Sequence, residues 1–269
     1  MEALTTFFFV NQWGFALLVG TVLLGLAETG YRVGLRLFAA KDEARRSQIG
    51  GVQGAVLGLL GLLLGFTFSM AVNRFELRRD LVLKEANTIG TTWLRAGLLP
   101  EAQRAPVKDL LRRYVDVRVQ AQLASDDPVQ LAEGLRQSAE IEYALWQHAE
   151  AAAQSAPTPI TATIPATFIV TLNEMIDTDA ERVTASRNTI PAAVWMLLII
   201  VAAFGCLISA YGSGSQGVRS AFTSGFLPVL LTVVIVLIFD LMHTHQGVVS
   251  ISQQPMLDLQ QSMQTPAAK

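Results

Sequence analysis

Three side chains of types that commonly bind metal ions lie close together where the last long apolar stretch of the chain ends. They are Asp240, His243 and His245. Carboxylate and imidazole groups are zinc ligands, and zinc needs a full set of them in a fixed geometry. No further strong ligand lies beside these residues, and polar side chains are common where an apolar helix leaves a membrane. The pattern favours a helix exit over a metal site, and the role of the three residues stays open.

The rest of the sequence lacks the patterns that are typical of enzymes. It contains no Walker loop, dinucleotide fingerprint, H-E-x-x-H sequence or nucleophile elbow. The single cysteine, Cys206, lies within an apolar stretch and is interpreted as a packing residue. Glu28 and Asp240 lie at the edges of apolar stretches, which argues against a proton relay at mid-membrane depth. We expect a protein that is not an enzyme, with no cofactor and no bound metal.

Four nearly charge-free stretches are long enough to cross a bilayer, which needs about 20 apolar residues. They cover about residues 7–26, 52–72, 192–210 and 226–242. Only 16% of all residues are charged, which is low for a soluble domain and fits apolar segments set apart from one charged block. The sequence predicts an all-α, multi-pass integral membrane protein. Its expected parts are a first transmembrane pair (1–72), a helical extramembrane domain (73–190), a second transmembrane pair (191–246) and a polar C-terminal tail (247–269).

Local signals predict the helices of the extramembrane block. Apolar spacing and proline positions indicate helices over 106–123, 128–154 and 166–188, with a proline-rich loop over 155–165. The connection between the first two crossings is expected to turn close to Gly50 and Gly51. No structure is assigned to the tail that begins at Gly247.

Residues 50–99 form the stretch around which the chain is organised. Residues 50–72 are apolar or small, charge begins at Arg74, and no proline interrupts the stretch before Pro100, so we expect one long helix that leaves the membrane and continues into water. Four glycines lie on one narrow face of this helix, at Gly54, Gly58, Gly61 and Gly65. Such a stripe permits close helix packing in a bilayer. The same periodicity also fits a face turned to lipid or to the core.

This long helix also carries a family resemblance. Residues 62–66 (LLLGF), Arg74-Phe75, Glu85 and Leu94-Arg95 ahead of Leu99-Pro100 are together similar to the second transmembrane helix of bestrophins and its extension; Glu85-Ala86-Asn87 is a phrase of the related bacterial proteins. The chain as a whole resembles the bacterial bestrophin-like membrane proteins, through further phrases at residues 173–177 and 252–255.

The resemblance implies a fold, a function and a location. It implies a homo-oligomer, a pentamer in bestrophins, which would conduct small inorganic anions across the bacterial inner (plasma) membrane. It places an apolar neck on the second transmembrane helix at Gly58, Leu62 and Phe66, where Gly58 departs from the apolar side chain expected. An apolar ring closes a pore by dewetting. A non-conducting interaction or scaffold protein, acting through its helical extramembrane domain, is the alternative.

Charge is unevenly distributed along the extramembrane block. Residues 74–113 hold nine Lys or Arg and five acids, whereas residues 126–181 hold ten acids and one Arg. This is either an ordinary helical surface whose halves attract each other or a basic collar at a pore mouth, formed by Arg74, Arg78, Arg79 and Lys84. The net charge of −2 gives no support for a nucleic-acid partner. Positive charge in the short loops favours an extracytoplasmic block, whereas the bestrophin resemblance implies a cytosolic one.

Overall fold

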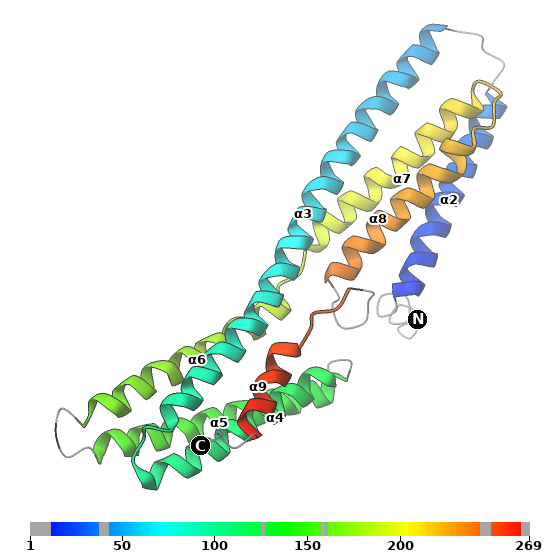
Figure 1. The fold of residues 1–269 in the computed structure, drawn as a ribbon. Coiled ribbons are helices and arrows are strands. Elements are labelled where there is room, and N and C mark those ends of the chain that lie inside the picture. Colours follow the sequence, from blue (N-terminus) through cyan, green and yellow to red (C-terminus); the bar gives the residue numbers. More distant parts are fainter. Residues whose placement is uncertain are drawn as a thin grey trace. The chain divides into compact units, whose positions relative to one another are not determined.

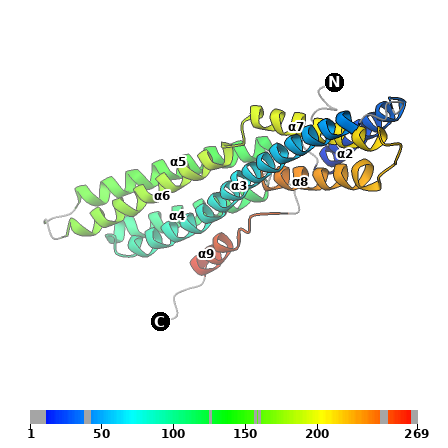
Figure 2. The same ribbon diagram turned by 90° about the horizontal axis from the view of Figure 1, so that it is seen from above.

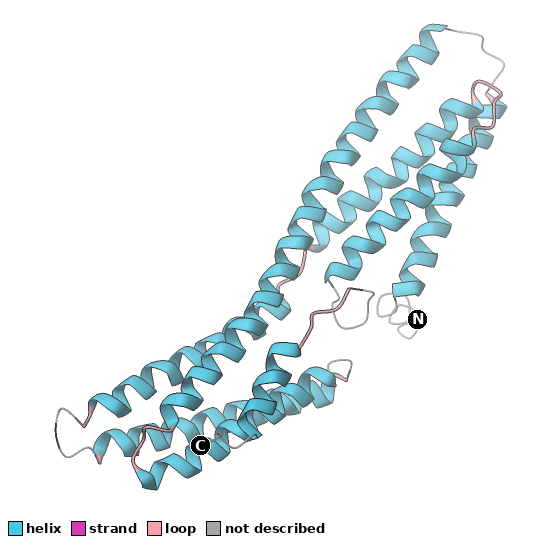
Figure 3. Cartoon of the chain, in the orientation of Figure 1, coloured by secondary structure: helices cyan, strands magenta, loops and turns pink. Residues whose placement is uncertain are grey.

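The computed structural model describes residues 12–37, 43–124, 127–155, 158, 161–242 and 249–264. The described residues form helices joined by short loops, with no strand among them (Figure 3). Four helical stretches are long and apolar enough to cross a membrane: Trp13–Arg36, Ser47–Ala96, Thr163–Gly214 and Phe222–Met242. The predicted all-α architecture with four crossings is therefore confirmed, although residues 7–11 of the first predicted crossing lie outside the described residues.

The chain divides into two compact units, a membrane unit (residues 1–75 and 189–250) and an extramembrane unit (residues 76–188 and 251–269). The helix α3 (Glu43–Ala96) contributes to both. The membrane unit also contains α2 (Gln12–Arg36), α7 (Ala192–Gly214), the short π-helix η1 (Phe222–Phe226) and α8 (Leu227–Met242). The extramembrane unit also contains α4 (Glu101–Leu123), α5 (Pro128–Gln154), α6 (Thr163–Arg187) and α9 (Gln254–Gln264).

In the membrane unit, α2 packs along α7 and also contacts α8 (Figure 1). Three glycines bring the backbones of α2 and α7 together. A Cβ atom at Gly30 would lie 2.2 Å from the carbonyl oxygen of Leu207, and one at Gly214 would lie 2.2 Å from the carbonyl oxygen of Tyr31. Gly34 meets the Tyr211 carbonyl in the same way, at 2.4 Å. The close helix packing that glycine permits in a bilayer occurs here, between α2 and α7.

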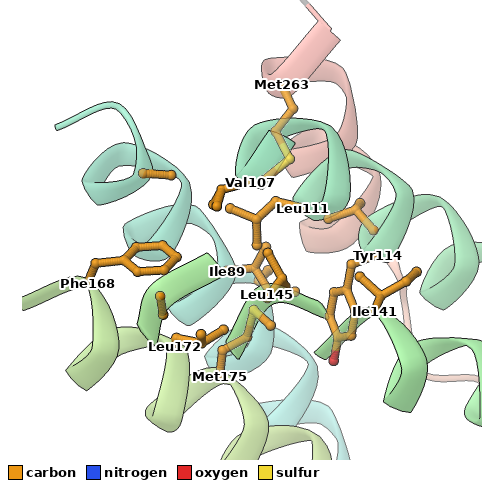
Figure 4. Close-up of a cluster of buried hydrophobic side chains, with 14 of the residues drawn as sticks. Ile89, Val107, Leu111, Tyr114, Ile141, Leu145, Phe168, Leu172, Met175 and Met263 are labelled. Carbon is orange, nitrogen blue, oxygen red and sulfur yellow. The ribbon is translucent and has the colours of Figure 1, made fainter. Parts of the chain in front are cut away.

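In the extramembrane unit, α4, α5 and α6 run side by side (Figure 2). Their apolar faces and one face of α3 enclose a core in which Leu111, Tyr114, Leu145 and Phe168 are completely buried (Figure 4). Helix α5 begins where its sequence signal indicates, because the Asp127 carboxylate accepts hydrogen bonds from the backbone N–H groups that follow Pro128. Methionines of α9 close one side of this core, where Met256 and Met263 are buried.

Three local expectations were wrong or incomplete. The predicted turn near Gly50 and Gly51 is absent, because α3 starts at Glu43 and runs through both glycines, each of which costs a helix only about 1 kcal/mol. Helix α4 starts at Glu101 rather than at Pro106, which lies inside it. The tail contains α9, an 11-residue helix whose buried methionines lie seven residues apart. Tertiary packing stabilises such a short helix more than its own propensity does.

We predict that the α2–α7 contact tolerates no side chain at Gly30. Gly30→Ala places a methyl group against a backbone carbonyl that cannot move aside, so we expect a loss of about 1–3 kcal/mol in unfolding free energy. The control is Gly25→Ala on the same helix, where nothing lies within 4 Å of the new Cβ. Unfolding of the purified protein in detergent, followed by circular dichroism, measures both. Equal stability of the two variants would contradict the packing described here.

Candidate functional site

Within the membrane unit, one face of α3 packs against α7. Leu57 and Leu60 lie against Gly205 of α7. About one turn earlier on α3, Gln53 approaches Gly212 of α7. Leu60, Thr67 and Ala71 are buried on the same face. These positions recur every three to four residues, as expected for a helix that contacts its neighbours along a single stripe.

The opposite face of α3 is not covered by the described part of the chain. Leu62 is 57% exposed and Phe66 is 64% exposed, and Gly58 lies on the same side one turn earlier. None of the four stripe glycines has a neighbour within 4 Å of a Cβ built on it; they are Gly54, Gly58, Gly61 and Gly65. The residues that the sequence singled out as neck and as packing stripe therefore share an apolar surface that none of the described residues buries.

The residues of the predicted basic collar make different contacts. The Arg78 guanidinium donates hydrogen bonds to the backbone carbonyls of Ala185 and Asn188 at the end of α6. Lys84 pairs with Glu181 at 2.7 Å, and Arg79 pairs with its neighbour Asp80 at 3.1 Å. Arg74 is half-buried. Arg78 and Lys84 thus fasten α3 to α6.

A buried ionic cluster lies inside the extramembrane unit, and the sequence analysis missed it. Glu85 of α3 is 0% exposed and lies between two guanidinium groups. One oxygen of its carboxylate accepts a hydrogen bond from Arg118 of α4 at 2.8 Å, and the other contacts Arg182 of α6. Arg118 also pairs with Asp179 of α6 at 2.6 Å. Buried charges require partners of this kind because burial removes their hydration.

A second polar contact extends this cluster to α5. The Tyr114 hydroxyl donates a hydrogen bond of 2.9 Å to the Glu142 carboxylate. Burial, together with the negative charge of Asp179, raises the pKa of Glu142 to about 7. Burial also raises the pKa of Tyr114 well above its usual value, so its hydroxyl keeps its proton and remains a donor. Every long helix of this unit therefore contributes an ionisable side chain to its interior.

One signal in the sequence could have revealed the cluster. Arg118 follows Leu111, Tyr114 and Val115 at helical spacing, so a cation lies on the apolar stripe of α4. A cation on a buried stripe requires a buried acid from another helix. In the sequence, Glu85 stands out only as part of a family phrase. Which acid pairs with Arg118 depends on how the helices pack, and this packing could not be predicted from the sequence alone.

Asp240 is the one member of the possible metal-binding group that the structure describes. Asp240 is buried, and its carboxylate accepts a hydrogen bond of 3.0 Å from the backbone N–H of Val249. His243 and His245 lie outside the described residues. Within those residues, no group of three or more metal-binding side chains is found. Cys206 is buried in the membrane unit, as its surroundings in the sequence predicted.

These features define an all-α, multi-pass membrane protein with a helical extramembrane unit. Its membrane helices, α3 among them, each expose large apolar side chains. A model of the Bestrophin-like domain matches residues 19–256, and the chain belongs to this family. Membership supports an ion-channel kind of function.

Solved structures show the same fold. A crystal structure of a variant of a bacterial bestrophin homologue from Klebsiella pneumoniae aligns with a TM-score of 0.62 and 15% identity, covering 93% of this chain and 96% of that one. A second variant of a bacterial bestrophin homologue from the same organism aligns with a TM-score of 0.57 and 15% identity, covering 92% and 98% of the two chains. No curated protein matches the sequence.

We predict that the ionic cluster is a stability determinant of the extramembrane unit. Glu85→Gln leaves two buried guanidinium groups without their shared carboxylate, and we expect a loss of about 3–5 kcal/mol in unfolding free energy. Glu76→Gln makes the same chemical change at an exposed position of α3 and should stay within about 0.5 kcal/mol of the parent protein. Chemical denaturation in detergent measures both. A neutral Glu85→Gln would show that the cluster contributes little to stability.

Proposed function

We propose that the chain forms a homo-oligomeric ion channel whose pore is lined by the uncovered face of α3. The observation that supports this most is the exposure of Leu62 and Phe66 on a helix whose opposite face is packed against α7. In a ring of copies, this face would point to the shared axis. Membership in the Bestrophin-like family supports the channel class independently of the geometry.

The neck of the proposed pore consists of Leu62 and Phe66, with Gly58 above or below them according to the orientation of α3. Rings of apolar side chains exclude water from a narrow pore and so act as a barrier to ions without any charged group. Gly58 contributes no side chain, so the neck is widest at its level. Residues 50–73 hold no acid, and this is compatible with anion passage.

Neighbouring copies would meet along the glycine stripe. Gly54, Gly61 and Gly65 lie beside the neck on the same uncovered half of α3. Lipid offers no hydrophobic drive for helix association, so close packing of backbones must hold membrane helices together. A helix from the next copy would find this surface open. We propose a pentamer by analogy with bestrophins, in the bacterial inner membrane.

The second part of the proposal is that the channel is selective for anions. The basic collar would raise the concentration of small inorganic anions near the pore. Arg79 and Lys84 are each paired with a carboxylate, which reduces their attraction for anions. The collar therefore contributes less than four unpaired cations would, and the apolar neck remains the main determinant of passage.

We predict that shortening the neck side chain increases conduction. Phe66→Ala removes the largest apolar group of the neck, so less dewetting should raise the current at a given voltage severalfold in planar bilayers. Phe68→Ala is the matched control, because Phe68 lies about 200° away around the same helix and should leave the current unchanged. Reversal potentials in asymmetric chloride and sodium gradients report the selectivity. Absence of current from the parent protein and from both variants would favour the scaffold alternative.

We predict that the glycine stripe is required for assembly. Gly61→Leu fills a surface that is open within one chain, so the monomer should fold while the oligomer is lost on native mass spectrometry. Gly25→Leu, on α2, also enters open space and should leave the assembly intact. An unchanged oligomer in Gly61→Leu would place the interface between copies elsewhere.

A further inference from the structure

The buried ionic cluster of the extramembrane unit is not balanced in charge. Its carboxyl groups are Glu85, Asp179 and Glu142, and its guanidinium groups are Arg118 and Arg182. Both guanidinium groups contact Glu85, and Arg118 also contacts Asp179. With all three carboxyl groups ionised, the cluster carries one unbalanced negative charge. One additional proton makes it neutral.

Glu142 is the carboxyl group at which this proton would bind. It forms no salt bridge among the described residues, and its hydrogen-bond partner is the neutral Tyr114 hydroxyl at 2.9 Å. Its side chain is half-buried, so water can deliver and remove a proton. One turn earlier on α5, the buried Ser138 hydroxyl has no hydrogen-bond partner among the described residues. Asp179 Oδ1 of α6 also lacks a hydrogen-bond partner among the described residues, but it lies 2.6 Å from the Arg118 guanidinium. Glu142 is therefore the carboxyl group of the cluster that has no salt bridge among those residues.

We propose that Glu142 is a proton-binding site that holds α5 against α4 and α6, and that its loss of a proton weakens this contact. The step is a simple exchange, in which a carboxylate oxygen takes a proton from water and no other bond changes. When Glu142 is protonated, the cluster is neutral. When it is ionised, its charge faces Asp179 of α6 across a poorly hydrated interior, and the two repel each other.

The groups around Glu142 account for a pKa near neutrality. Tyr114 of α4 bonds to it, and the charges of Arg118 on α4 and Asp179 on α6 act on it. Glu85 of α3 and Arg182 of α6 contact each other, and Glu85 also contacts Arg118. Burial raises its pKa most, and Asp179 raises it further. Tyr114 and Arg118 oppose this shift, and the resulting pKa is about 7.

The sign of the stability effect follows from this shift. The side chain of an unfolded glutamic acid has a pKa of about 4.3, whereas burial raises the pKa of Glu142 in the folded protein to about 7. The folded state therefore holds the proton more tightly than the unfolded state does. Glu142 contributes stability fully below the lower value, and this contribution is lost as the pH rises to the higher one.

The proposal is tested by titrating the full-length protein in detergent. Infrared difference spectra of the protonated carboxyl band should show a group that titrates between about pH 6 and about pH 8 and that disappears in Glu142→Gln. The same variant should unfold at a higher temperature than the parent protein at pH 8, because the amide removes the buried charge. Glu140→Gln, on an exposed residue of the same helix, should leave both the band and the unfolding temperature unchanged.

Two further variants should move the midpoint in opposite directions. Tyr114→Phe removes a donor that favours the ionised carboxylate, so the midpoint should rise. Asp179→Asn removes the repelling charge, so the midpoint should fall by about one pH unit. Circular dichroism confirms that each variant is folded before it is titrated. A carboxyl band that persists in Glu142→Gln, or a parent protein without one in this range, would overturn the proposal. Neither measurement requires the protein to conduct ions.

Discussion

The burial of the Glu85 carboxylate constrains the extramembrane unit more than any other single feature. A charge placed inside a helical bundle is tolerated only when groups of opposite charge meet it with good geometry. Here these groups come from two other helices, because Arg118 lies on α4 and Arg182 lies on α6. A slip of either helix along its axis would separate the charges. The cluster therefore fixes the register of α3, α4 and α6, while the apolar residues around it supply most of the burial.

The membrane unit depends on a different constraint, since charge cannot organise helices in lipid at low cost. In this unit, close contact between helix backbones takes the place of charge pairs. Gly30 and Gly34 of α2 meet carbonyl groups of α7, and Gly214 of α7 meets α2 in return. The four stripe glycines of α3 have no such partner among the described residues. Two glycine patterns that look alike in sequence thus differ in the structure: one closes a contact inside the chain, and the other is open to a second molecule or to lipid.

Much of the fold could be predicted because it depends on local chemistry. Runs of apolar residues long enough for a bilayer identified the four crossings, and Asp127 before Pro128 marked the start of α5. The start of α3 could not be placed, because glycines such as Gly50 are compatible with both a turn and a membrane helix. Helix α9 was missed because it depends on its contacts with α4, where Arg112 donates a hydrogen bond to the Met263 carbonyl.

In the candidate site, too, features set by local sequence could be predicted, whereas features set by contacts between helices could not. Periodicity alone placed Leu62, Phe66 and the stripe glycines on one side of α3, since angles around a helix follow from the residue numbers. The sequence could not say whether another helix of the chain covers that side. It also suggested that the basic residues after the second crossing act together, whereas Arg78 and Lys84 each hold α6. Contacts between helices that are distant in sequence decide the role of a charged residue.

The uncovered surface of α3 extends beyond its apolar part. Within the extramembrane unit, Leu83, Asn87 and Thr91 line two grooves of about 460 and 370 Å³, one bordered by α9 and the other by Glu174 of α6. Leucines next to amides and hydroxyls suit a contact between proteins in water, whereas small and apolar residues suit one in lipid. Each unit thus leaves part of the same helix free, with a surface chemistry matched to its own solvent. A helix that is exposed in both environments is a candidate for contacts between copies of this chain, and this exposure supports the proposal that α3 lines the pore.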